Sequence, residues 1–545
     1  MNLGPTDAQA AALDALKPGK FGHVATNPRD SGADPAKCPS LAANEYLLVS
    51  EDAKIRPDRE GGGQLCGSAH APPAGHEAPP PRAPFVRPCH ACLSQYSARH
   101  ESNARTYVRR FPFAIKSAKG CKLTDTDGKE YYDCKNVAGT LALGHNHDIV
   151  IDAAKKFLDS GAPIQSLDMA TPEKKAYMET LFSVLPQELS KYRLVRPGAV
   201  SWARLHFCSP AGTDVLDAAV KLCKYATGRR TVMAFHGGYH GHGAGPLAMM
   251  GNLGAKEALT GLMSDVHFLP YPYAYRNPFG VDGEEGEKTV MKYIETIFAD
   301  AESGIPKPAC VVVEAIQGEG GVGALSPTAL RELRRITAEH DVPLVVDEVQ
   351  AGFCRSGDFW AFQNNGSGIV PDVVCMSKAA GGSMPLAVMA YKPELDAWSA
   401  GAHTGTFRGN QIAFACGKAQ TDYLRDNKMH ERAAEKGARL MGHLRDIMAE
   451  SSTIVDVRGR GLMLGVEFGL ADEVDHLGLP KPDGEMAGEV QKLALRNGMI
   501  QERGGRGGSV MRFLCPLIVE DEDIDAMADI FRTAVKQAEV GLGRV

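Results

Sequence analysis

The sequence predicts an α/β protein, with a large domain on a mostly parallel sheet and a smaller α+β domain. Between residue 166 and about residue 400, helical patterns alternate with short apolar runs, which is typical of a parallel sheet covered by helices on both faces. After about residue 416 this alternation ends, and a chain of 545 residues is too long for one small core. The runs that predict strands lie at 205–208, 231–235, 310–313, 344–346 and 373–376.

Four segments are predicted along the chain. Residues 1–98 form a partly flexible N-terminal extension, because they contain Gly61-Gly62-Gly63, Pro79-Pro80-Pro81 and few apolar clusters. Its one helix-like piece is the alanine-rich stretch over about 7–16. The other segments are the N-terminal part of the small domain, the large domain and the C-terminal part of the small domain, at 99–165, 166–415 and 416–545.

Local patterns predict the elements of the small domain. Alternating apolar positions around Asp127-Gly128 predict a β-hairpin, and a helix is expected over 148–160 after a loop at 139–147. A helix is expected near 429–451, and strands near 455–467 and 509–513. These elements predict a mixed sheet with helices beside the main one.

Composition excludes several classes of function. The hydrophobic content of 44% and the charged content of 23% are ordinary for a globular protein, and the net charge of -6 favours neither nucleic acid nor an anionic membrane as partner. No apolar stretch approaches the ~20 residues of a membrane-spanning helix. The first residues lack the basic start and apolar run of a secretory signal, so a cytoplasmic location is expected.

The 13 cysteines predict buried free thiols in a reducing compartment, because most lie singly within core-like patterns. One cluster differs: Cys89-His90-Ala91-Cys92 follows Cys66, His70 and His76. A second, regularly spaced pair of ligands is missing, so the cluster is interpreted as incidental and no metal site is expected. The single cysteines are Cys208, Cys223, Cys310, Cys375, Cys416 and Cys515.

Two charged residues at the ends of predicted strands give the strongest indication of the chemistry of this protein. Asp347 directly follows the apolar run 343–346, so its carboxylate is expected to be buried and to need a cationic partner. Lys378 follows the next run and precedes Gly381-Gly382, a setting for a desolvated amine. Together they predict a site for pyridoxal 5'-phosphate, with Lys378 forming a Schiff base and Asp347 pairing with the pyridine nitrogen.

Three loops at other strand ends complete the pattern. Gly212 and Thr213 open a predicted helix over 215–227, where backbone N–H groups suit a phosphate, although an ordinary helix cap has the same appearance. Tyr239 and His240 stand among glycines at 237–241, which suits an aromatic ring stacked on a cofactor or a plain turn. The loop 314–321 places two carboxylates and an amide at a strand end, which is costly unless they have partners.

These motifs resemble those of the class III (ω-amino acid) aminotransferases of the pyridoxal-phosphate fold type I, from about residue 99 to the C-terminus. The resemblance implies Lys378 as the Schiff-base lysine, Asp347 as the pyridinium partner and Tyr239 as the stacking aromatic. It further implies that Gln350 bonds the phenolic oxygen of the cofactor. Thr406 would reach the phosphate of a neighbouring subunit, so the active unit would be a homodimer, with dimer versus tetramer left open. The matching segments are 212–213, 237–241, 314–321, 347–357, 377–382 and 404–410.

Longer stretches resemble the branch of this class that transfers the ω-amine of L-2,4-diaminobutyrate to 2-oxoglutarate, giving aspartate 4-semialdehyde and glutamate. Arg512, with apolar flanks, is the candidate for binding a substrate carboxylate. The resemblance implies that Glu319 masks this arginine when a cationic substrate is bound. Asp217 and Ala351 depart from the class, which commonly has glutamate and threonine there. The stretches are 99–105, 141–147, 250–254, 263–273, 401–410 and 510–516.

Three alternatives stay open at this point. The substrate is another ω-amino acid or diamine; or the chain is a pyridoxal-phosphate isomerase or decarboxylase, which would turn over without a keto acid; or it is a non-catalytic scaffold. The presence of Lys378, Asp347 and Gln350 argues against a scaffold.

Overall fold

The computed structural model describes residues 90–190, 192–196, 199–364 and 366–544. The chain divides into two compact units, residues 1–106 with 112–114, and residues 107–111 with 115–545. In the first unit the described part contains α3 (His90–His100). The predicted helix over 7–16 and the cysteine and histidine cluster at 66–92 lie outside the residues whose side chains are described.

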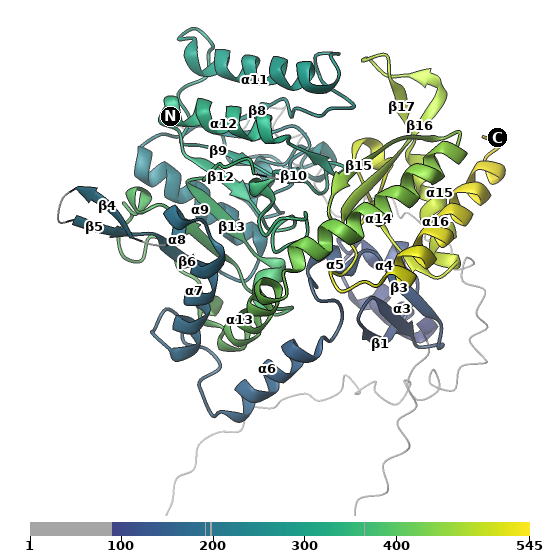
Figure 1. Ribbon diagram of the computed structural model, residues 1–545, viewed down its shortest axis with the longest axis horizontal. Helices are drawn as coiled ribbons and strands as arrows, with labels where there is room; N and C mark the ends of the chain where they lie inside the picture. The colour runs from purple at the N-terminus through teal and green to yellow at the C-terminus, as the bar shows by residue number, and fades with distance from the viewer. Residues whose placement is uncertain (1–89, 191, 197–198, 365, 545) are drawn as a thin grey trace, which may run out of the picture. The chain divides into compact units, whose positions relative to one another are not determined.

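Within the described residues of the second unit, the main sheet has seven strands and is mostly parallel, as predicted (Figure 1). Strands β12, β13, β9, β7 and β8 pair in parallel, whereas β14 is antiparallel to both of its neighbours. The order across the sheet is β6 (Arg204–Phe207), β14 (Val388–Tyr391), β13 (Val373–Met376), β12 (Leu344–Asp347), β9 (Cys310–Val313), β7 (Val232–Phe235) and β8 (Val266–Leu269).

Helices cover both faces of this sheet, which explains why its central strands are continuous apolar runs. Val345 and Val312 pack on one face against α9 (Gly212–Thr227). Val346 and Val313 pack on the other face, in the cluster that contains α12 (Pro327–Glu339). Figure 1 shows α9 and α12 on either side of the strands. Further helices of this region are α7 (Pro172–Val184), α11 (Gly283–Ala299) and α13 (Gln411–Asp426).

The parallel register brings two predicted site residues to one edge of the sheet. Asp347 is the last residue of β12 and pairs with Cys375 of β13, three positions before Lys378. Lys378 opens the 3-10 turn η6 (Lys378–Gly381). The carboxyl ends of parallel strands form the ligand-binding edge of such sheets.

Two smaller sheets combine segments that are far apart in sequence. The predicted hairpin is confirmed as β2 (Lys122–Asp125) and β3 (Glu130–Asp133), which extend β1 (Ile115–Lys119). On its other side β3 pairs in parallel with β18 (Met499–Ile500). The second sheet contains β15 (Ile454–Arg460), β16 (Met463–Val474), β20 (Val510–Phe513), β19 (Glu502–Gly504) and β17 (Pro480–Pro482).

Helices α14 (Met429–Glu450), α15 (Gly484–Arg496) and α16 (Asp521–Gly541) lie beside the second sheet (Figure 1). Helix α6 (Asp148–Asp159) ends one residue before its predicted end, and the prediction for α14 is equally close. The six single cysteines are buried free thiols, as predicted. Among the described residues, no helix combines the length and apolarity needed to cross a membrane.

Two glycines of α14 provide a test of its packing. A Cβ at buried Gly437 would overlap the carbonyl oxygen of Gly461, whereas a Cβ at exposed Gly442 would meet nothing within 4 Å. We expect Gly437→Ala to lower the free energy of unfolding by about 1–3 kcal/mol through overpacking. Gly442→Ala should raise it by up to about 1 kcal/mol through helix propensity. Denaturant unfolding of both variants measures this, and equal effects would contradict the packing.

Candidate active site

A cavity of about 310 Å³ lies at the carboxyl edge of the main sheet. It brings together most of the predicted site residues, which come from five separate chain segments. Its lining includes Gly212, Thr213, Tyr239, His240, Glu314, Glu319, Asp347, Gln350 and Lys378, with Tyr107 and Ala138 from the N-terminal side.

Asp347 is buried beside a histidine. The residue is 4% exposed, and its Oδ2 lies 2.8 Å from Nδ1 of His240, which is also buried. Burial opposes protonation of His240, but the hydrogen bond and charge of Asp347 outweigh it and raise the pKa of the histidine. His240, predicted to contact the cofactor, thus also orients the carboxylate of Asp347.

Lys378 has an unusual backbone and a desolvated amine. Its φ of 46° lies in the left-handed region, which a residue with a side chain adopts at a cost of about 1–3 kcal/mol. Burial lowers the pKa of its ammonium, against the opposing effects of Glu319 and Asp347. A lowered pKa increases the neutral fraction, and the neutral amine is the form that acts as nucleophile or base.

The N-terminus of α9 faces the cavity and is held by close contacts. Thr213 Oγ1 accepts a hydrogen bond of 2.8 Å from the backbone N–H of Gly243. Gly241 has a φ of 110°, and a Cβ there would lie 2.5 Å from Cβ of Thr213, so only glycine fits. The helix begins at Gly212, three residues before its predicted start, which brings its N-terminal N–H groups to the cavity.

Gln350 and Glu314 hold the loops around the cavity. Gln350 Nε2 donates to the carbonyl of Ala138 at 3.0 Å, whereas its Oε1 is buried without a hydrogen-bond partner among the described residues. Glu314 accepts hydrogen bonds from the N–H groups of Tyr239 and Gly318 at 2.9 and 3.0 Å. Burial raises the pKa of Glu314 to about 7.

A charged cluster lies next to the cavity. Arg512 is 0% exposed, and its Nη2 contacts the carboxylate oxygens of Glu319 at 2.8 and 2.9 Å. Glu502 stands opposite Arg512 in the β19–β20 register, with Oε2 at 3.9 Å from Nη2. Arg512 Nε and Nη1 and Glu502 Oε2 are buried without hydrogen-bond partners among the described residues. Such unsatisfied buried groups are expected where a ligand completes the bonding.

The structure does not bring every predicted residue into the cavity. Thr406, in η8 (Thr406–Gly409), is absent from the described lining, and Arg512 reaches it through Glu319. Sequence reasoning assigned no role to Glu314, Tyr107 or Glu502. Burial and the charge of Glu502 raise the pKa of Tyr107 to about 12, so its hydroxyl keeps its proton. Glu314 could have been predicted, because its carboxylate directly follows an apolar strand. Glu502 could not, because its neighbours in the sequence are polar or charged and do not indicate burial.

Comparison with known proteins decides the family. Residues 103–535 match the model of the family described as aminotransferase class-III. The chain is a class III aminotransferase. Such enzymes use pyridoxal 5'-phosphate, so the predicted cofactor is confirmed.

Relatives of this class III aminotransferase cover most of its length. It is 47% identical over 443 residues to the diaminobutyrate–2-oxoglutarate aminotransferase of Rhizobium meliloti (strain 1021), covering 81% of this chain and 91% of the relative. Identity to the Haemophilus influenzae protein of the same name is 47% over 441 residues, 80% of this chain and 93% of the relative. An amine transaminase from an uncultivated Pseudomonas species shares the fold, with a TM-score of 0.70, 24% identity, and coverage of 81% of this chain and 98% of that one.

The cavity of this aminotransferase fits its cofactor. The start of α9 offers N–H groups for a phosphate, Asp347 offers a buried carboxylate for a pyridinium, and Lys378 offers a desolvated amine for an aldehyde. The unpartnered Oε1 of Gln350 shows that this amide has bonding capacity left toward the cavity. The assignment of each residue to a cofactor atom remains a prediction.

The pair of His240 and Asp347 predicts a pH dependence of stability. The raised pKa of His240 gives a contribution that is fully present below about pH 6.5 and is lost as the pH rises through the folded-state pKa. In cofactor-free protein, the difference in melting temperature between wild type and His240→Gln should therefore shrink between pH 6 and pH 9. Melting curves across this range measure it, and a constant difference would contradict the pairing.

His147 is the control, because burial lowers its pKa. Its contribution has the opposite sign of pH dependence: it grows as the pH rises toward about 6.5 and is complete above that value. His147→Gln should therefore lose more stability at neutral than at acidic pH.

Proposed function

We propose that this enzyme transfers the ω-amino group of L-2,4-diaminobutyrate to 2-oxoglutarate, reversibly giving aspartate 4-semialdehyde and glutamate. Two relatives at 47% identity, both named diaminobutyrate–2-oxoglutarate aminotransferase, support the proposal. The observation that carries it is the buried Arg512 between two acidic side chains, Glu319 and Glu502.

These three charges suit two different substrates. Glutamate and 2-oxoglutarate carry a carboxylate at the far end from the reacting carbon, and the unused donors of Arg512 can bind it bidentately. Diaminobutyrate carries an ammonium as well as a carboxylate at its far end. With Glu319 paired to Arg512, the positive charge is masked, and Glu502 supplies a carboxylate for the ammonium.

The residues of the cavity have separate tasks in this proposal. The bound cofactor supplies an electron-withdrawing ring that stabilises negative charge on the substrate carbon. Lys378 Nζ, whose ammonium has a pKa lowered by burial, would take the proton from that carbon. Asp347 keeps the ring nitrogen protonated, and Tyr239 and Gln350 hold the ring in place. Gly212, Thr213 and the start of α9 bind the phosphate.

We also propose a cytoplasmic homodimer. Thr406 does not line the described cavity of its own subunit, which supports the expectation that it serves a neighbour's phosphate. The buried free thiols support a reducing compartment.

The function is tested by an amino-donor screen on purified protein. Wild type should form glutamate from 2-oxoglutarate with diaminobutyrate as the preferred donor, and Lys378→Ala should reduce turnover by about 10²–10⁴-fold or more. It should also lose the visible absorbance of the bound cofactor, whereas the exposed-lysine control Lys492→Ala should keep both. A different preferred donor, or turnover without any keto acid, would contradict the proposal.

Glu502 provides a test of substrate choice. Removing its charge in Glu502→Gln should raise KM for diaminobutyrate about tenfold, the effect of losing one hydrogen bond to a charged group. KM for 4-aminobutyrate, which has no far ammonium, should stay within about twofold. Steady-state kinetics with both donors measure this, and an equal rise for both would exclude the proposed contact.

A further inference from the structure

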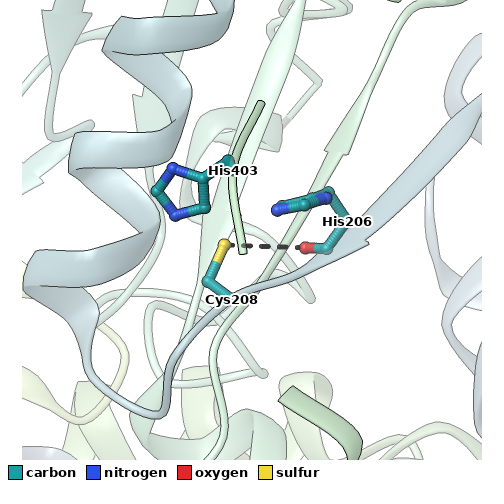
Figure 2. A group of neighbouring side chains, drawn as sticks. All are labelled: His206, Cys208 and His403. Carbon is teal, nitrogen blue, oxygen red and sulfur yellow. Dashed lines mark hydrogen bonds between the residues drawn. The ribbon is translucent and has the colours of Figure 1, made fainter. Parts of the chain in front are cut away.

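A histidine, a cysteine and a second histidine meet at the edge of the main sheet, outside the described cavity. Figure 2 shows the rings of His206 and His403 on either side of the Cys208 thiol. One ligand-type atom from each, two imidazole nitrogens and the sulfur, lie within 4.8 Å of one another. The imidazole centroids are 5.5 Å apart.

Three features of the fold bring these side chains together. His206 lies in β6 and Cys208 directly follows this strand, two residues later, so they point to the same side. The backbone N–H of Cys208 donates to Ala387 at 2.9 Å, which fixes its position next to β14. His403 comes from a loop that Arg408 holds, because Arg408 Nη1 donates to the His403 carbonyl at 3.0 Å.

The polar atoms of this cluster have few other partners. Nε2 of His206 is buried and has no hydrogen-bond partner among the described residues. The thiol of Cys208 makes a contact of 3.8 Å with the carbonyl oxygen of His206, which is long for a hydrogen bond. A buried ring nitrogen without a partner is costly unless a ligand completes its bonding.

We propose that His206, Cys208 and His403 bind a divalent transition-metal ion of the zinc class. Imidazole nitrogen and thiolate sulfur are the donors that zinc prefers, at about 2.0–2.1 and 2.3 Å. These bond lengths place tetrahedral ligands about 3.5 Å apart. Since the three ligand atoms now lie within 4.8 Å of one another, each side chain needs to move by only about 1 Å. Three protein ligands leave the fourth tetrahedral position for a water molecule.

The imidazole of His206 is in the form that binds a metal, whereas the thiol of Cys208 must first lose its proton. Burial, with the proximity of His403 and the charge of Arg408, lowers the pKa of His206 to about 4, so its ring is neutral at pH 7 and can donate an electron pair. The guanidinium of Arg408 is itself paired with Asp168. Burial raises the pKa of the Cys208 thiol, which opposes its ionisation, so the metal–sulfur bond has to compensate for the loss of the proton. On binding, the S–H bond breaks, its proton passes to the buffer, and the sulfur electron pair forms the metal bond.

Such an ion would join two segments that bind cofactor phosphate groups in the proposed function. Cys208 directly precedes the turn that leads to Gly212 and Thr213, and His403 lies three residues before Thr406. The two segments already touch, since a Cβ at Gly405 would overlap the hydroxyl of Ser209. The metal thus has a structural role, and its binding can be measured independently of turnover.

The test is a titration of chelator-treated full-length holoenzyme with Co²⁺, which reports a thiolate ligand by its charge-transfer absorbance. We expect one Co²⁺ per chain, and release of about one proton as the thiol ionises. Cys208→Ser should abolish the charge-transfer band, and His403→Gln should weaken binding at least about tenfold. The double variant Cys89→Ser/Cys92→Ser should bind as wild type does. The visible absorbance of the bound cofactor checks that each variant has folded.

Several outcomes would overturn the proposal. These are the absence of a saturable charge-transfer band in wild type, its persistence in Cys208→Ser, or its loss in the Cys89→Ser/Cys92→Ser variant. If Cys208→Ser fails to fold, His403→Gln decides the question, because unchanged affinity in that loop variant also excludes the site. None of these results depends on which amino donor the enzyme uses.

Discussion

The parallel register between β12 and β13 is the constraint on which the rest of the site depends. It sets Asp347 beside Cys375, so that the carboxylate and the turn carrying Lys378 emerge at one edge of the sheet. The apolar residues that fix this register also desolvate both groups. The buried carboxylate of Asp347 has His240 as its partner at 2.8 Å, which offsets part of the cost of removing it from water. The register of the two strands therefore determines both where Asp347 and Lys378 lie and how far they are removed from water.

The charges that we propose to bind the substrate come from a different part of the fold. Arg512 and Glu502 face each other across β19 and β20 of the smaller sheet, whereas Glu319 comes from the loop after β9 and β10 (Ile316–Gln317) of the main domain. One arginine is thus shared by two carboxylates from separate parts of the chain. A buried arginine with unused donors is costly, and this cost favours any ligand that offers a carboxylate. In the proposed function, this arrangement lets one pocket accept substrates of different charge.

Sequence reasoning succeeded where chemistry and local pattern coincide. Asp347 and Lys378 follow apolar runs, so the sequence placed both residues at strand ends, and the structure confirms those two strands. Strand β14 was not predicted, because its four residues follow a loop that contains glycine and proline. It pairs antiparallel with β13. Glu502 could not be found, because its partner is set by strand register ten residues away. The cluster of His206, Cys208 and His403 was equally hidden, since its third member approaches only through the tertiary fold.

The strained backbone of Lys378 shows how firmly the main domain fixes the amine. The two residues after it are held by buried hydrogen bonds: Gln420 donates to the carbonyl of Ala379 at 2.5 Å, and Tyr177 donates to that of Ala380 at 2.6 Å. These bonds, from α13 and α7, offset a left-handed φ that costs about 1–3 kcal/mol. The position of the amine is therefore set by helices that carry none of the charges proposed to bind the substrate. If the proposed roles are correct, changes in β19 or β20 alter the choice of substrate and leave the amine of Lys378 in place.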